Sequence, residues 1–160
     1  MNESEEVLLG NLDNATKPGY RMIEAVFDTG ACHSCVPPGV FPGKVQPSKM
    51  SKAGKKYRGP DKSPIPNLGE IRGHFLSEED VMANMLWQVA AIERPLIAGT
   101  QITKAGNRVE LEADGGMITN IKSGKTIRLY RRGDAEGGVY ILRMWVPLDP
   151  KVGFQRQVKA

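Results

Sequence analysis

The sequence predicts a mainly β protein with one or two short helices. The 160 residues include 18 Gly and 11 Pro, and both residue types interrupt helices and favour turns. Strong helical periodicity is scarce, whereas short runs rich in β-branched and aromatic residues recur along the chain. Because 40% of the residues are hydrophobic, the chain can bury one core and is most economically a single domain.

The first predicted strand covers residues 20–27. Its β-branched and aromatic residues favour a strand, and it leads directly into Asp28-Thr29-Gly30-Ala31. This stretch resembles the water-activating motif of aspartic peptidases, in which a carboxylate lies where a strand gives way to a loop. The alternative is an ordinary strand-ending turn, since Asp, Thr and Gly all suit turns.

The chemistry of such a motif requires two carboxyl groups. They share one proton: the ionised carboxylate takes a proton from water, and the protonated one hydrogen-bonds the scissile carbonyl. Neither a metal nor another cofactor is needed. The motif occurs once in this chain, so Asp28 must pair with an aspartate of a second subunit, or the chain is not a peptidase. In this role Gly30 would allow close backbone approach, and the Thr29 hydroxyl would hold the loop by a hydrogen bond.

Over residues 20–102 the chain resembles the retropepsins, the aspartic peptidases of retroviruses and retrotransposons. The resemblance is carried by the Asp28 loop, by residues 64–70, which close a Gly- and Lys-rich segment, and by residues 94–100, which follow an apolar run. It implies a single-lobed acid-protease fold. It also implies an endopeptidase that is active as a homodimer, with one Asp28 from each subunit, and that cleaves a polypeptide substrate such as a retroelement polyprotein.

The resemblance assigns two further segments to the site. A flap hairpin that closes over substrate would lie at residues 55–66, and a hydrophobic-hydrophobic-Gly element would support the catalytic loop. Pro60 and Pro64 stiffen this flap, because proline fixes φ and removes a donor. Ala98 stands where the family usually has Gly, with Gly99 next to it. The assigned residues are Arg58, Gly59, Pro60 and Asp61 in the flap and Leu96, Ile97 and Ala98 in the supporting element.

The chain continues beyond what a minimal retropepsin needs. Four runs have strand character, and Gly-containing turns at residues 114–116 and 122–125 separate the first three as hairpins. We therefore expect an extra C-terminal β-meander. The runs are residues 109–113, 117–121, 126–130 and 139–146.

The sequence predicts two short helices. Ser77, followed three residues later by an acid, predicts a helix start, and residues 96–105 predict a second short helix.

We expect an N-terminal extension at residues 1–19, a retropepsin-like domain with its β extension at residues 20–146, and a tail at residues 147–160.

Cys32 and Cys35 offer a rival chemistry. Their Cys-x-x-Cys spacing suits redox exchange or half of a zinc site, and His33 or His74 could complete a ligand set. A second cysteine pair is missing, however, and prolines follow where a redox motif would need a helix. The retropepsin resemblance instead makes both cysteines small core hydrophobes.

Nucleic-acid binding is the second rival. The net charge is +4, and residues 44–62 carry seven Lys or Arg against one acid. Such a cluster can meet phosphates, and Tyr57 could stack on a base. The bland alternative is a solvated loop, because no recognised nucleic-acid motif accompanies the charges.

Location and activity are the last expectations. No apolar stretch is long enough to span a membrane, and the acidic start, with Glu3, Glu5 and Glu6, is unlike a signal peptide. We expect an intracellular, cytoplasmic protein that needs no membrane. A retropepsin-like domain without activity, used for protein interaction, remains the alternative to an enzyme.

Overall fold

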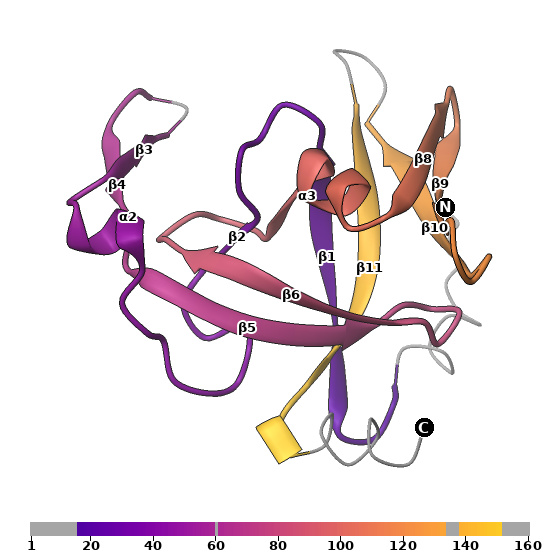
Figure 1. The fold of residues 1–160 in the computed structure, drawn as a ribbon, viewed down its shortest axis with the longest axis horizontal. Coiled ribbons are helices and arrows are strands. Elements are labelled where there is room, and N and C mark those ends of the chain that lie inside the picture. The colour runs from indigo at the N-terminus through magenta and orange to yellow at the C-terminus, as the bar shows by residue number, and fades with distance from the viewer. Residues whose placement is uncertain (1–15, 60, 134–137, 152–160) are drawn as a thin grey trace, which may run out of the picture.

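The computed structural model describes residues 16–59, 61–133 and 138–151 and confirms a mainly β protein (Figure 1). Nine strands form one mixed sheet, and β3 and β4 form a separate two-stranded hairpin. The elements are β1 (Tyr20–Asp28), β2 (Cys35–Val36), α2 (Lys49–Lys52), β3 (Lys56–Arg58), β4 (Pro64–Pro66), β5 (Gly69–Leu76), β6 (Met82–Val89), β7 (Leu96–Ala98), α3 (Gly99–Lys104), β8 (Asn107–Glu112), β9 (Gly115–Asn120), β10 (Thr126–Arg132) and β11 (Val139–Pro147).

The first and last strands of the sheet lie side by side. β1 pairs antiparallel with β11 along its length, from Tyr20 opposite Pro147 to Phe27 opposite Tyr140. The remaining order is β1-β7-β2-β6-β5-β11, so the sheet closes on itself, with Trp145 opposite Leu76 as the pairing between β11 and β5. Segments far apart in sequence therefore hold the strand that carries Asp28.

The core lies inside this closed sheet. Alternation along β11 sends Leu142, Met144 and Val146 into the main cluster, while Trp145 packs in a smaller cluster on the other face. Trp87 is fully buried and contacts the Phe41 and Phe75 rings. Both tryptophans are thus packing anchors, because large aromatic side chains contribute most of the apolar area that a core removes from water.

The predicted C-terminal meander is present as β8, β9 and β10, and β10 pairs with β11. One turn is shifted from its predicted place. Gly115 and Gly116 lie inside β9 rather than in the turn, which falls at residues 113–114. A Cβ on Gly116 would approach the Glu110 carbonyl oxygen to 2.6 Å, so a glycine here permits the close approach of β8.

The helix predicted at Ser77 is wrong. Residues 77–81 form the turn of the β5–β6 hairpin, in which the Ser77 hydroxyl accepts the Glu79 and Val81 N–H groups at 3.2 and 3.1 Å. A Ser side chain can cap a helix or a turn by the same kind of bond. Here the full pairing of β5 with β6 decides for the turn. The second predicted helix begins later than expected, at Gly99, because residues 96–98 form β7.

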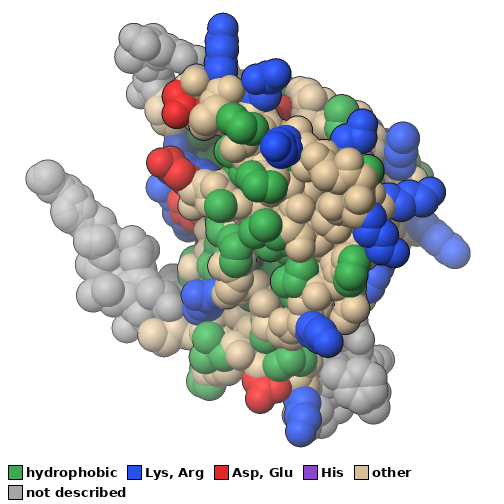
Figure 2. All heavy atoms as spheres, turned by 90° about the vertical axis from the view of Figure 1, so that its left-hand side faces the viewer, with side chains coloured by type: hydrophobic (Ala, Val, Ile, Leu, Met, Phe, Trp, Pro, Cys, Tyr) green, Lys and Arg blue, Asp and Glu red, His purple; other side chains and the backbone are tan. Residues whose placement is uncertain are grey.

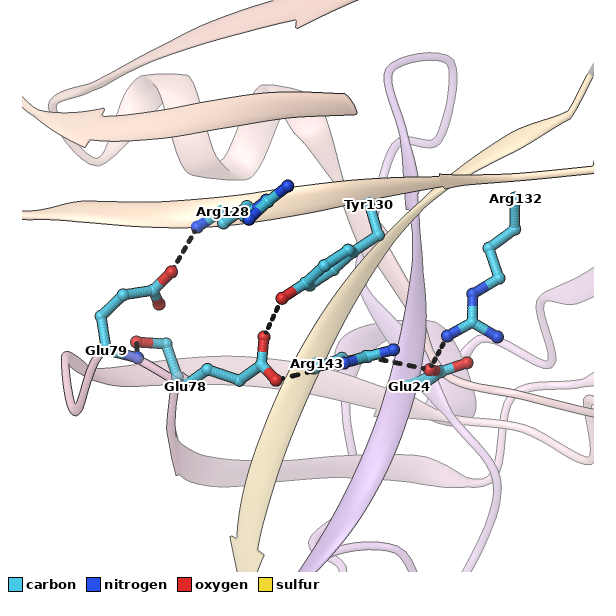
Figure 3. Close-up of polar contacts among 8 residues, drawn as sticks. Glu24, Glu78, Glu79, Arg128, Tyr130, Arg132 and Arg143 are labelled. Carbon is cyan, nitrogen blue, oxygen red and sulfur yellow. Dashed lines mark hydrogen bonds and ion pairs between the residues drawn. The ribbon is translucent and has the colours of Figure 1, made fainter. Parts of the chain in front are cut away.

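A network of charged side chains fastens this turn to the sheet (Figure 3). The Glu24 carboxylate on β1 accepts from Arg132 at 2.6 Å and from Arg143 at 3.3 Å. Arg143 also reaches Glu78 at 3.2 Å and lies 4.3 Å from the centre of the Tyr130 ring. Four segments, namely β1, β10, β11 and the β5–β6 turn, are therefore cross-linked on the outer face of the sheet.

The described part of the predicted N-terminal extension contacts the β5–β6 turn. Lys17 lies before β1, and its ammonium group is 3.3 Å from the Asp80 carboxylate. β11 runs one residue beyond the predicted domain end, to Pro147. In the described parts of the chain, no helix has the length and apolar character needed to cross a membrane.

Candidate active site

Asp28 is the last residue of β1 and is half-buried. Its Oδ1 accepts the Gly30 N–H at 2.8 Å. Asp28 has no other side-chain hydrogen bond in the described ranges, and no second carboxyl group is bonded to it there. One chain therefore presents one carboxylate where β1 ends and the following loop begins, as the sequence predicted.

β7 supports this loop from behind. It runs parallel to β1, with Phe27 opposite Ile97 and Asp28 opposite Ala98. Ile97 and Ala98 are fully buried. In Figure 1 the start of α3 lies beside the end of β1. The supporting segment predicted at Leu96, Ile97 and Ala98 thus lies next to the Asp28 loop.

The glycine that this packing demands is Gly99. A Cβ there would lie 3.1 Å from the Thr29 Cα and 3.3 Å from the Phe27 ring, closer than backbone neighbours tolerate without a shift. The retropepsin resemblance placed Ala98 where the family usually has glycine, and the glycine next to it is the one that packs on the Asp28 loop. At Gly30, by contrast, a Cβ would lie an ordinary 3.4 Å from the Asp28 carboxylate, so the expected steric need for glycine at that position is weak.

Two hydroxyl groups hold the Asp28 loop, and neither was predicted from the sequence. The buried Ser34 Oγ accepts the Ala98 N–H at 3.0 Å, and Thr100 Oγ1 donates to the Ala31 carbonyl at 3.5 Å. The Thr29 hydroxyl was expected to hold the loop by a hydrogen bond. Thr29 is instead exposed and makes no side-chain hydrogen bond within the described residues. The local sequence provided little indication of this role for Ser34, because a Ser between two cysteines is equally typical of an ordinary turn.

The predicted flap is a hairpin. β3 and β4 pair antiparallel, with Tyr57 opposite Ile65, and in Figure 1 this hairpin projects away from the nine-stranded sheet. At the tip, the Gly59 N–H donates to the Ser63 carbonyl at 3.0 Å. Hydrogen bonds from the Ser63 hydroxyl and N–H lower the pKa of Asp61. Arg58 is exposed at the end of β3, and Pro60, also assigned to the tip, lies outside the described residues.

Asn67 anchors the base of this hairpin and was not selected from the sequence. It is buried, and its Oδ1 accepts from the Ser48 hydroxyl at 3.1 Å and from the Gly69 N–H at 2.8 Å. Its amide donates to the Tyr57 hydroxyl at 3.1 Å and to the Gln88 carbonyl oxygen at 2.9 Å. All the bonds that the side chain can form are made, so β3, β6 and the start of α2 are held at one point.

The β3–β4 hairpin also meets the segment that follows the Asp28 loop. Burial raises the pKa of Tyr57 to about 12, and the neighbouring Cys35 adds to that increase. Burial likewise raises the pKa of the Cys35 thiol. Cys35 is therefore a buried hydrophobe, as expected, but Cys32 is exposed, and the two thiols are free. No three His, Cys, Asp or Glu side chains of the described ranges are grouped as a metal site requires.

Basic side chains surround the hairpin. Figure 2 shows the face that carries α2 and β3–β4, with Lys and Arg spread around hydrophobic side chains. No Lys or Arg of residues 44–59 and 61–62 has an ion pair within the described structure. Tyr57 is half-buried and bonded to Asn67, so its ring is not the open stacking surface that a nucleic-acid site would use.

The site thus combines one carboxylate, a loop held from behind by β7 and Gly99, and an anchored hairpin. A single carboxylate can act as a general base, but polarising a carbonyl in the same step needs a separate hydrogen-bond donor, which a second, protonated carboxyl group can supply. Comparison of the chain with family models, with curated proteins and with solved structures found no match.

Proposed function

We propose that this protein is an aspartic endopeptidase of the retropepsin type, active as a homodimer. The observation that carries the proposal is the support of the Asp28 loop. β7 runs parallel to β1 up to Asp28, and Gly99 packs on Thr29. This arrangement holds a carboxylate in a fixed position at a loop that faces outward, which is what a dyad requires.

The second carboxylate would be the partner's Asp28. Thr29 and Gly30 are exposed, and the Thr29 hydroxyl has no partner in the described part of its own chain. A twofold axis beside this loop would bring identical residues together, because an isologous interface contacts itself. The exposed hydroxyl would then have a partner across the axis.

The reaction follows from such a pair. The ionised carboxylate would take a proton from water, which attacks the scissile carbonyl, and the protonated one would donate a hydrogen bond to the developing oxyanion. An extended peptide would lie under the β3–β4 hairpin by strand addition, with its side chains in pockets. A polyprotein of a retroelement is the substrate type that we propose.

Peptide cleavage by the wild type and by Asp28→Asn, with solution mass recorded on the same samples, tests this function. Cleavage confined to a wild-type dimer is expected. Mixing supplies a sharper test: at equal amounts of both proteins, activity per wild-type chain should fall to about half, because mixed dimers lack one aspartate. Undiminished activity in the mixture would mean that one chain suffices.

A catalytically silent interaction domain is the second candidate. It is favoured by the same observation that requires a partner, namely that among the described residues the Asp28 carboxylate accepts a hydrogen bond from Gly30 alone. A well-folded monomer that cleaves no peptide would establish this candidate in place of the enzyme. The charges of residues 44–62 then become the feature to test, by the salt dependence of nucleic-acid binding.

A further inference from the structure

A small pocket opens directly beside the candidate catalytic loop. It has a volume of about 290 Å³ and lies between residues 32–34, strand β6 and helix α3. This volume is at the lower end for ligand pockets, so it suits one side chain rather than a large ligand. Because residues 32–34 follow the Asp28 loop immediately, a peptide held at Asp28 would place a neighbouring side chain here. Its lining is Cys32, His33, Ser34, Leu86, Gln88, Thr100, Gln101 and Lys104.

Most polar groups in the lining are already engaged. The Ser34 hydroxyl accepts the Ala98 N–H, and the Gln101 amide donates to the Leu86 carbonyl at 3.1 Å. Gln88 bonds to Asn67 and, at 3.3 Å, to Glu70. These bonds hold the three side chains in place and so shape the pocket.

Lys104 differs from these side chains because its charged group has no partner among the described residues. It is the last residue of α3, it is exposed, and its ammonium group has no hydrogen bond or ion pair within the described residues. No carboxylate belongs to the lining, and the His33 ring and the Cys32 thiol are likewise without a side-chain partner there. The pocket therefore has a cation, uncommitted polar groups and no acid.

We propose that this pocket recognises an acidic side chain of the polypeptide substrate and that Lys104 determines this specificity. The proposal rests on the proposed peptidase function. A glutamate or aspartate near the scissile bond would pair its carboxylate with the Lys104 ammonium group, while a lysine or arginine would meet a like charge. Because the pair would be partly solvated, its contribution is that of a surface ion pair.

Matched peptides test the proposal. Each pair carries Glu or Gln at one position, scanned through the residues next to the scissile bond, and kcat/KM is measured at pH 5.5 and low salt, where a free glutamate is ionised. The wild type should prefer one Glu peptide by roughly two- to fivefold. Lys104→Gln should abolish that preference, and Lys104→Glu should reverse it in favour of a Lys peptide. Lys122→Glu, an exposed lysine in the β9–β10 turn, should behave as the wild type.

A binding experiment distinguishes the proposed peptidase function from the proposed specificity of the pocket. Fluorescent versions of the same peptides are titrated into Asp28→Asn protein, with and without Lys104→Gln. Cleavage with equal rates for Glu and Gln at every position would overturn the role of Lys104 and leave the peptidase standing. Binding that favours Glu and depends on Lys104, without any cleavage by the wild type, would retain the pocket and overturn the peptidase. Neither cleavage nor Glu-dependent binding would overturn both.

Discussion

Gly99 lies directly against Thr29, so that a Cβ on Gly99 would be 3.1 Å from the Thr29 Cα. Two segments more than sixty residues apart in the chain therefore meet backbone to backbone at the candidate site. The parallel pairing of Asp28 with Ala98 brings them together. This contact makes the position of the Asp28 carboxylate depend on the start of α3.

Gly99→Ala should destabilise the protein by about 1–3 kcal/mol, because the new methyl group would force the Thr29 backbone and the Phe27 ring to shift. Gly30→Ala is the matched control, since its Cβ would lie at an ordinary 3.4 Å from the Asp28 carboxylate. We expect its effect to remain below about 1 kcal/mol. Urea unfolding of both variants measures the difference. Equal losses of stability would contradict the role given to Gly99.

Asn67→Ala should lower the free energy of unfolding by about 2–4 kcal/mol, because the groups bonded to this buried amide would each lose a partner. It should also lower kcat/KM, since the flap base is released from Gln88 and Tyr57. Asn84→Ala offers a control: Asn84 is exposed and has no side-chain hydrogen bond in the described chain. That variant should stay within about 0.5 kcal/mol of the wild type.

Stability should fall at alkaline pH. The pKa values of Cys35 and Tyr57 are raised in the folded protein, so the unfolded chain loses these protons first. Their contribution is complete below the ordinary thiol value of 9.0 and is lost as pH rises toward about 12. Urea midpoints from pH 8 to about pH 11 should decline less steeply in a Cys35→Ala, Tyr57→Phe double variant. An unchanged slope would show that these two groups do not titrate as the burial implies.

Stability should also fall at acidic pH, through His74. Burial lowers the pKa of this histidine from its ordinary 6.5, and its buried Nε2 has no hydrogen-bond partner among the described residues. The unfolded chain therefore binds the proton first, and stability declines as pH falls below 6.5. His74→Gln should flatten this part of the profile in urea unfolding at about pH 7 and pH 5.

This acid dependence matters for the assay of function. A shared proton between two carboxyls predicts cleavage that is highest at acidic pH and falls as the pair loses that proton. The loss of stability through His74 would act on the acidic side of the same profile. Comparing the wild type with His74→Gln shows how much of the acidic limb comes from His74, since the variant lacks that titrating group.

Local patterns in the sequence predicted most elements. Alternating and β-branched runs placed β1, β8, β9, β10 and β11 to within a few residues, because strand formation follows side-chain pattern. They failed at Ser77, where the same Ser suits a helix cap or a hairpin turn. They also failed at Asn67, since no local signal tells whether a loop asparagine will be buried.

The sequence by itself determined the β class, the strand-to-loop position of Asp28 and the absence of a second motif, and the retropepsin resemblance predicted the hairpin at residues 55–66. Only the tertiary structure decided which glycine supports the loop, which residues anchor the β3–β4 hairpin, and that Lys104 and residues 32–34 line one pocket. The reason is physical. Strand and turn preferences act between neighbours in sequence, whereas steric contact and hydrogen-bond satisfaction act between residues that meet only when β1 pairs with β7 and with β11.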